Sequence, residues 1–138
     1  MVSINPSHTV PAPKYAPSKT MVAKINAACL EKKPDYREIV KLYKELCSDS
    51  YKNTDDLKER LFDTFTAPLR ERPARRTEYL LCLAASTDSS LTAKLLSNYR
   101  FSFQKEDFHW ALRDAAYAAN EKSAKSLLNF HADPFFTN

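Results

Sequence analysis

Residues 79–99 (YLLCLAASTDSSLTAKLLSNY) and residues 110–130 (WALRDAAYAANEKSAKSLLNF) carry one pattern twice, at an offset of 31 residues. The identical pairs at this offset are Leu81 and Leu112, Ala84 and Ala115, Ala85 and Ala116, Ala93 and Ala124, Lys94 and Lys125, Leu96 and Leu127, and Asn98 and Asn129. A period between about 20 and 50 residues is typical of repeat architectures, in which a unit cannot bury its apolar face alone and stacks on a neighbour. The pattern predicts two stacked helical hairpins.

Each copy contains two short helical segments separated by a turn. The apolar spacing predicts helices over residues 77–86, 89–98, 107–118 and 121–130. Because the turns between paired helices are short, the two helices of a pair are expected to be antiparallel neighbours.

The composition is that of one globular domain. The chain has 138 residues, 43% of them hydrophobic, which is enough for a core. No stretch reaches the roughly 18 apolar residues that a membrane span needs, so no membrane contact is expected. Its three cysteines, Cys29, Cys47 and Cys82, form neither an even set nor a CxxC pair. Reduced thiols in a cytoplasmic protein are therefore expected.

Glycine is absent from the chain, where about 7% is average. Tight β-hairpins rely on glycine or asparagine at positive φ, so an all-β fold is disfavoured. Dinucleotide fingerprints, Walker loops and nucleophile elbows all require glycine. The enzyme families that depend on these motifs are excluded.

An extended or disordered arm is predicted at residues 1–17, which hold four prolines among small polar residues. A first helix is predicted to begin near Ser18 or Thr20 and to stop before Pro34. The arm is left out of the predicted domain, a single all-helical unit over residues 18–138.

Two more helices complete an amino-terminal helical portion over residues 18–68. Asp35 and Glu38 have the spacing of a capping box at the start of the second helix, which carries the strongest amphipathic stripe in the chain. Thr54 is predicted to cap the third helix, and Pro68 is predicted to end it.

The second copy extends to LRDAAYAANEKSAKSLLNFHADP over residues 112–134, which resembles the ankyrin repeat. In that family an inner helix with an Ala-Ala pair is followed by a turn, an outer helix with a leucine pair and a Gly-Ala-Asp segment. The matching positions here are Ala115, Ala116, Asn120, Leu127, Leu128, Ala132 and Asp133. The family's Thr-Pro-Leu-His opening and its glycine are missing from this copy. The resemblance covers residues 77–138 and implies two ankyrin-like hairpins capped by the amino-terminal helices.

The resemblance also implies partner-binding positions. The family contacts partners just after the alanine pair, just before the glycine position and just before the inner helix. The corresponding residues are Glu78, Ser86, Thr87, Tyr99, Glu106, His109, Tyr117, Ala118 and Phe130. Aromatic residues supply much contact area at little conformational cost. For Tyr99 and Phe130 the alternative is packing on the next layer.

Three further aromatic residues have alternative roles. Phe135 and Phe136 follow Pro134 and are predicted either to fold back over the last helix pair or to contact a partner or a second copy of the chain. Trp110 begins an inner helix and is expected to be core or half-buried.

No motif in the sequence indicates a catalytic site, a cofactor site or a metal site. A cysteine nucleophile could in principle pair Cys82 with His109 or His131. Cys82, however, lies in the apolar run LLCLAA, where a buried inert thiol is the common outcome. The scattered cysteines and histidines have no metal-ligand spacing, so no metal or cofactor is expected.

The sequence therefore predicts a noncatalytic protein-protein interaction module, an adaptor or inhibitor of another protein. By analogy alone, the module could be a bacterial effector or the regulator of an effector. An exported effector would act in the cytosol of the host cell. The alternative is nucleic-acid binding, because the net charge is +4 and the predicted linker 69–76 carries four arginines between Arg70 and Arg76. A self-assembling subunit is a third possibility.

Overall fold

The computed structural model describes residues 13–48, 50–71 and 77–131. These residues form seven α-helices and one 3₁₀ helix, with no β-structure among them beyond one isolated bridge. The helices are α1 (Lys19–Leu30), α2 (Tyr36–Leu46), α3 (Asp55–Arg70), α4 (Thr77–Thr87), α5 (Ser89–Tyr99), α6 (Lys105–Tyr117) and α7 (Glu121–His131), with the 3₁₀ helix η2 (Arg100–Ser102) between α5 and α6. The prediction of an all-α fold of about seven helices is confirmed.

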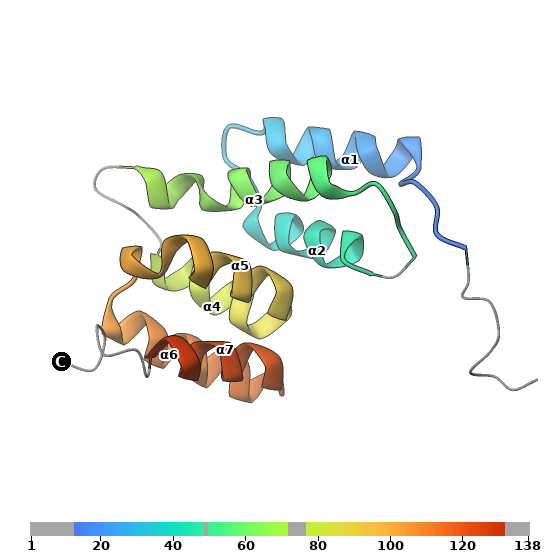
Figure 1. The fold of residues 1–138 in the computed structure, drawn as a ribbon. Helices are drawn as coiled ribbons and strands as arrows, with labels where there is room; N and C mark the ends of the chain where they lie inside the picture. The colour runs from blue at the N-terminus through green and yellow to red at the C-terminus, as the bar shows by residue number, and fades with distance from the viewer. Residues whose placement is uncertain (1–12, 49, 72–76, 132–138) are drawn as a thin grey trace, which may run out of the picture.

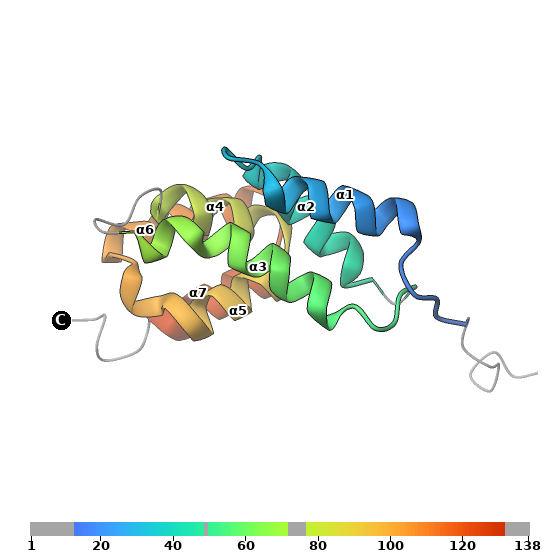
Figure 2. The same ribbon diagram turned by 90° about the horizontal axis from the view of Figure 1, so that it is seen from above.

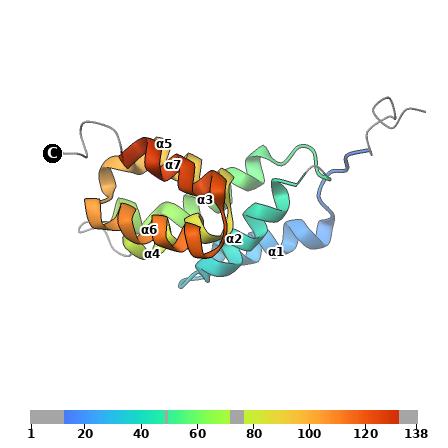
Figure 3. The same cartoon turned by 90° about the horizontal axis from the view of Figure 1, so that it is seen from below.

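The helices are arranged in three layers (Figure 1). The first layer holds α1, α2 and α3, the second holds α4 and α5, and the third holds α6 and α7. Helix α4 packs against α6 and α5 packs against α7, so corresponding helices of the two copies lie side by side (Figure 3). Helix α2 packs on the other side of α4. We call α2, α4 and α6 the inner row.

Local sequence explains where the first three helices begin. The Ser18 hydroxyl and the Asp35 carboxylate accept backbone N–H bonds from the first turns of α1 and α2. Thr54 occupies the N-cap position of α3, as predicted, but its side chain makes no capping hydrogen bond. Asp55 and Asp56 instead place negative charge at the positive end of the helix dipole.

Helix α3 continues two residues beyond Pro68, which was predicted to end it. Proline lacks the N–H that would close the turn, so other contacts must hold the extension. Leu69 is buried. The Arg70 guanidinium donates to the Thr66 hydroxyl at 2.8 Å and to the Asp63 carbonyl at 2.9 Å. These contacts keep the last turn helical.

Helix α6 ends in a Schellman motif built without glycine. The N–H of Asn120 donates to the Ala115 carbonyl at 2.8 Å, and the N–H of Ala119 donates to the Ala116 carbonyl at 3.0 Å. Ala119 sits at φ 55°, the left-handed position that glycine usually fills. Asn120 then accepts the N–H of Ser123 and caps α7. The turn predicted at Asn120 therefore forms with the backbone of Ala119 in the strained left-handed conformation.

The two copies differ in burial because only the first is covered on both sides. Leu81 and Ala85 of α4 are fully buried, whereas the equivalent Leu112 is half-buried and Ala116 is exposed. In the outer helices the equivalent residues Leu96 and Leu127 are both buried, and Leu128, the residue after Leu127, is 50% exposed. Helices α6 and α7 cover one face of the first hairpin. No described residue covers the equivalent face of the second hairpin.

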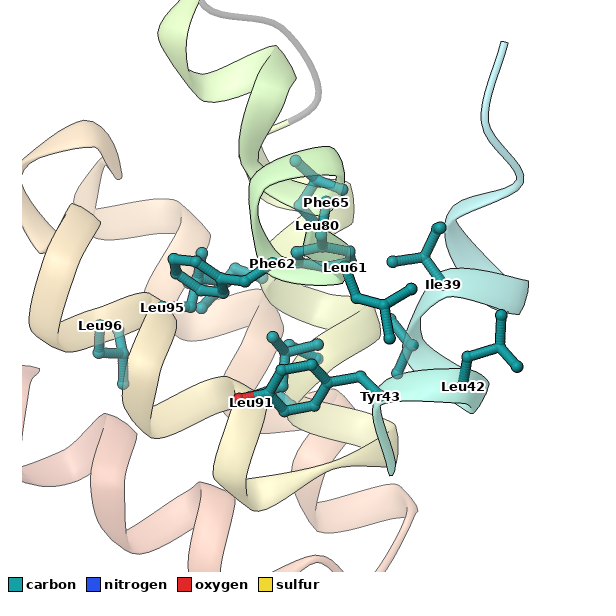
Figure 4. Packing of buried hydrophobic residues seen from close by; sticks show 14 of the residues in the cluster. Ile39, Leu42, Tyr43, Leu61, Phe62, Phe65, Leu80, Leu91, Leu95 and Leu96 are labelled. Atoms are coloured by element: carbon teal, nitrogen blue, oxygen red, sulfur yellow. The ribbon is translucent and has the colours of Figure 1, made fainter. Parts of the chain in front are cut away.

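One hydrophobic core joins all three layers. Seen from above, α3 lies across the second layer (Figure 2), and it contacts both α4 and α5. Figure 4 shows this junction, where the labelled side chains come from α2, α3, α4 and α5: Ile39, Leu42, Tyr43, Leu61, Phe62, Phe65, Leu80, Leu91, Leu95 and Leu96. The amino-terminal helices and the repeated half are therefore parts of one folded unit.

Polar contacts reinforce the junction between α3 and α5. The Lys94 ammonium lies 2.7 Å from a carboxylate oxygen of Glu59 and 4.4 Å from the ring centre of Phe62. This ion pair is half-exposed and contributes at most about 1 kcal/mol.

The described end of the predicted arm touches the domain. The N–H of Tyr15 donates to the Ser50 carbonyl at 3.1 Å, and the N–H of Lys52 donates to the Tyr15 carbonyl at 3.0 Å. Residues 1–12 lie outside the described part of the chain. In the described ranges no helix combines the length and apolarity that crossing a bilayer requires.

Candidate protein-binding face

The outward side of α6 carries an aromatic and basic surface. Trp110, Arg113 and Tyr117 lie three to four residues apart, so the helical repeat places them on one side. Trp110 is 42% exposed and Tyr117 is 84% exposed. The Arg113 guanidinium stacks on the Trp110 ring, 4.3 Å from its centre, which orients both side chains. Trp110 is therefore only partly covered, which corresponds to the second of the two placements predicted for it, and part of its ring is accessible.

Helix α4 continues this surface beside α6. Tyr79 and Ser86 are seven residues apart on its outward side, and Tyr79 is partly exposed. The Cys82 thiol lies near the Asp114 carboxylate of α6, close enough for its charge to act on the pKa of the thiol. Burial, followed by the negative charge of Asp114, raises the pKa of Cys82 to about 12. A thiol with this pKa is protonated at neutral pH and is a poor nucleophile.

A groove of about 490 Å³ separates α2 from α4. Its α2 side carries basic residues and its α4 side carries hydroxyl groups. The lining residues are Arg37, Val40, Lys41, Lys44, Leu83, Ser86 and Thr87. We call this the α2–α4 groove.

A second hollow, of about 310 Å³, lies at the ends of the inner helices. It shares part of its lining with the α2–α4 groove and extends it to the turns before α5 and α7. Its residues are Lys44, Ser86, Thr87, Asp88, Ser89, Ala118, Ala119 and Asn120. Lys44, Ser86 and Thr87 line both the groove and the second hollow, so the two form one continuous depression from α2 to the tip of α6.

Asp88 is the buried acid of this second hollow. One carboxylate oxygen, Oδ1, accepts the N–H of Ser90 at 3.0 Å and caps α5. The other, Oδ2, is buried without a hydrogen-bond partner among the described residues. Burial raises the pKa of Asp88, although the Ser90 N–H and the positive charge of Lys44 act in the opposite direction.

The structure brings part of the predicted site together. Ser86, Thr87 and Ala118 line the same hollow, and Tyr117 is the residue next to Ala118. These four lie at the carboxyl ends of α4 and α6. The predicted residues Glu78, Glu106 and His109 are exposed near the amino-terminal ends of the same two helices.

The remaining described site residues pack against neighbouring side chains. The Tyr99 ring lies 6.1 Å from that of Phe62, and its hydroxyl accepts a hydrogen bond from Arg70 at 3.2 Å. Phe130 is half-buried against the core, with the Arg100 guanidinium 5.7 Å from its ring centre. Both placements agree with the packing alternative. Phe135 and Phe136 lie outside the described residues.

The basic linker is only partly described, because residues 72–76 are outside the described ranges. Arg70 makes hydrogen bonds to Thr66, Asp63 and Tyr99. Arg70 is exposed, but its guanidinium already makes three hydrogen bonds within the chain, which weakens the prediction that it contacts phosphates.

Four residues of this face were not predicted from the sequence: Arg37, Lys41, Lys44 and Trp110. A signal for the three basic residues was present, since they lie at i, i+4 and i+7 on α2, beside its apolar stripe. The pattern is also that of an ordinary solvated helix face, and only the packing of α2 on α4 makes it one wall of a groove. No group of three potential metal ligands occurs in the part of the chain that the structure describes.

Comparisons with protein-family models, curated proteins and solved structures find no match to this chain. The ankyrin resemblance therefore depends on the sequence positions quoted above and stays a prediction.

Proposed function

We propose that this chain is a noncatalytic protein-binding module whose partner docks on the outward side of the inner row. The supporting observation is the surface of α6, where Tyr117 and Trp110 hold large exposed aromatic areas on one helix face. Trp, Tyr and Arg are the residues that most often dominate binding energy at protein interfaces. With Arg113 stacked on Trp110, all three types occur together here.

A pre-organised surface favours binding because less side-chain freedom is lost on association. The stacking of Arg113 on Trp110 restricts both side chains at this surface. The resemblance to ankyrin repeats supports the same location, since that family also uses its inner helices. An adaptor or inhibitor acting in the cytosol is the form of this function that we favour.

Affinity capture with point variants tests the proposal. Full-length protein is used to isolate partners from source lysate, and each captured protein is purified and titrated directly. Tyr117→Ala and Trp110→Ala are each expected to weaken a direct complex about tenfold or more. Phe101→Ala, which removes another exposed aromatic residue on η2, is the matched control and should change affinity less than about twofold. Full retention of every partner by the two α6 variants would place the interface elsewhere.

Two further measurements separate the alternatives. Titration with labelled DNA and RNA at two salt concentrations tests nucleic-acid binding, whose affinity falls steeply with salt. The mass of the isolated protein in solution tests whether the partner is a second copy. Turnover of thiol-protease or nuclease substrates that disappears in Cys82→Ala would contradict a noncatalytic role.

A further inference from the structure

We propose that the α2–α4 groove binds an acidic segment of the partner that also carries an apolar side chain. This inference depends on the proposed function and specifies the chemistry of the partner. The groove adjoins the hollow at the tip of α6, next to Tyr117, so one partner can contact both regions.

The charge of the groove is one-sided. Arg37, Lys41 and Lys44 are exposed along α2 over seven residues, a length of about 10 Å at the α-helical rise. No carboxylate is among the described residues that line the groove. The two acids of α2 near these residues, Glu38 and Glu45, are not among the lining residues either. Three positive charges on one wall favour a negatively charged occupant.

The floor of the groove is apolar. Val40 is buried and Leu83 is half-buried, and both line the space between the helices. Such a floor contributes to binding only if the occupant brings apolar surface, at about 25 cal/mol per Å² removed from water. A purely acidic chain would leave this surface without a partner.

The α4 wall supplies hydrogen-bond acceptors. The Ser86 hydroxyl donates to the Leu83 carbonyl at 3.2 Å, and the Thr87 hydroxyl donates to the same carbonyl. Because both hydroxyl protons are used within the helix, the oxygens retain lone pairs that can accept hydrogen bonds. A polypeptide can supply N–H donors to this wall and carboxylates to the opposite one.

These features favour a polypeptide over a nucleic acid. A phosphodiester chain would place acceptors against the Ser86 and Thr87 oxygens. On passing Lys44 into the adjoining hollow, it would also approach the Asp88 carboxylate. An acidic protein segment avoids both conflicts, because its charges are side chains that can all face α2.

Peptide display on the full-length protein tests the inference. A library of random 16-residue peptides is selected against the immobilised chain, and the recovered peptides are titrated against two triple variants. Arg37→Gln, Lys41→Gln and Lys44→Gln remove the charges of the groove. Lys24→Gln, Lys105→Gln and Lys125→Gln remove the same net charge from exposed positions on α1, α6 and α7.

We expect recovered peptides to be enriched in Asp and Glu together with Leu, Ile or Phe. The groove variant should bind them about tenfold or more weakly, and the control variant should stay within about twofold of the unchanged protein. Circular dichroism and thermal melting verify that each variant is folded. If the triple groove variant is unfolded, the single variants Arg37→Gln and Lys41→Gln are titrated in its place.

Several outcomes would overturn the inference. These are recovery of peptides without acidic enrichment, equal weakening by both triple variants, or tighter binding of labelled RNA or DNA that needs the same three cations. Peptides that depend on Trp110 and Tyr117 but not on the α2 cations would reject the groove and leave the proposed function standing. A selection that yields no binding peptide would reject the inference, while affinity capture would still decide the proposed function.

Discussion

The hydroxyl of Ser123 in α7 donates a hydrogen bond to the hydroxyl of Thr92 in α5, at 3.1 Å, and both side chains are fully buried. The two residues are 31 apart, which is the period of the sequence repeat. Thr92 in turn donates to the Asp88 carbonyl at 2.8 Å. A short polar chain therefore joins the outer helices of the two hairpins within an otherwise apolar contact.

Removing either member of this pair should destabilise the fold unequally. Thr92→Val leaves the Ser123 hydroxyl buried without its acceptor and should cost about 1–3 kcal/mol of unfolding free energy. Ser123→Ala removes the donor, while Thr92 keeps its bond to Asp88, so about 0.5–1.5 kcal/mol is expected. Urea denaturation measures both values. The double variant should lose less than the sum of the single losses, and strict additivity would show that the hydroxyls are not coupled.

Replacing the strained alanine at the end of α6 should stabilise the protein. Ala119 has φ 55°, where a side chain is disfavoured by roughly 1–2 kcal/mol. Ala119→Gly removes this strain but increases the entropy of the unfolded chain, so a net gain of about 0.5–1 kcal/mol is expected. Calorimetry should show Tm rising by a few degrees. Ala118→Gly, one residue earlier at φ −84°, is the matched control and should not stabilise.

The same apolar substitution should have different costs in the two copies. Leu96 is fully buried between the hairpins, so Leu96→Ala should cost about 2–5 kcal/mol. Leu128 is the second leucine of the pair Leu127–Leu128 in the other copy and is 50% exposed. Leu128→Ala should therefore cost less than about 1 kcal/mol. Equal losses in chemical denaturation would mean that Leu128 is covered in solution.

Tyr43 should make stability fall at alkaline pH. Burial, followed by the neighbouring Cys47, Asp88 and Glu59, raises the pKa of Tyr43 from 10.0 to about 12. The folded state holds the phenol proton more tightly than the unfolded state, so this contribution is complete below pH 10 and is lost as pH rises through about 12. Tyr43→Phe should lack this fall, which is on the order of 2–3 kcal/mol in total. Urea midpoints between pH 8 and pH 11 measure the difference, and parallel profiles would contradict the assignment.

The Cys82 thiol should resist alkylation. In a Cys29→Ser, Cys47→Ser background, iodoacetamide should react at pH 8 at least about 100-fold more slowly than with an ordinary thiol, because the pKa of Cys82 is raised to about 12. Asp114→Asn removes the negative charge that, after burial, contributes most to the raised pKa of Cys82, so it should speed the reaction. Unfolding in urea should restore the ordinary rate. Fast alkylation of the folded protein would reopen the possibility of a reactive cysteine.

The repeat and the helical periodicity were sufficient to predict the helices. The observed bounds of α4 to α7 lie within about two residues of the predicted ones, because cap residues such as Asp88 and Asn120 are local in sequence. The end of α3 could not be predicted in this way. Its last turn is held by the burial of Leu69 and by the hydrogen bonds of Arg70, one of which reaches Tyr99, 29 residues away, and such contacts follow from packing.

The binding face was less predictable for the same reason. Ser86 and Thr87 could be chosen from the repeat, because they follow the alanine pair of one copy. Lys44 could not, since α2 lies outside the repeat and reaches this surface only by packing on α4. Trp110 was predicted to be core or half-buried because it begins an inner helix, and that position alone did not indicate that 42% of the residue is exposed beside Arg113.

The continuous core has a consequence for how the molecule responds to a bound partner. Because α3 is packed on α5 through Phe62 and Tyr99, the two halves share one apolar core, and melting of either half would expose core side chains of the other. Occupation of one groove should therefore slow amide hydrogen exchange as far away as α7, in a single cooperative response along the whole chain.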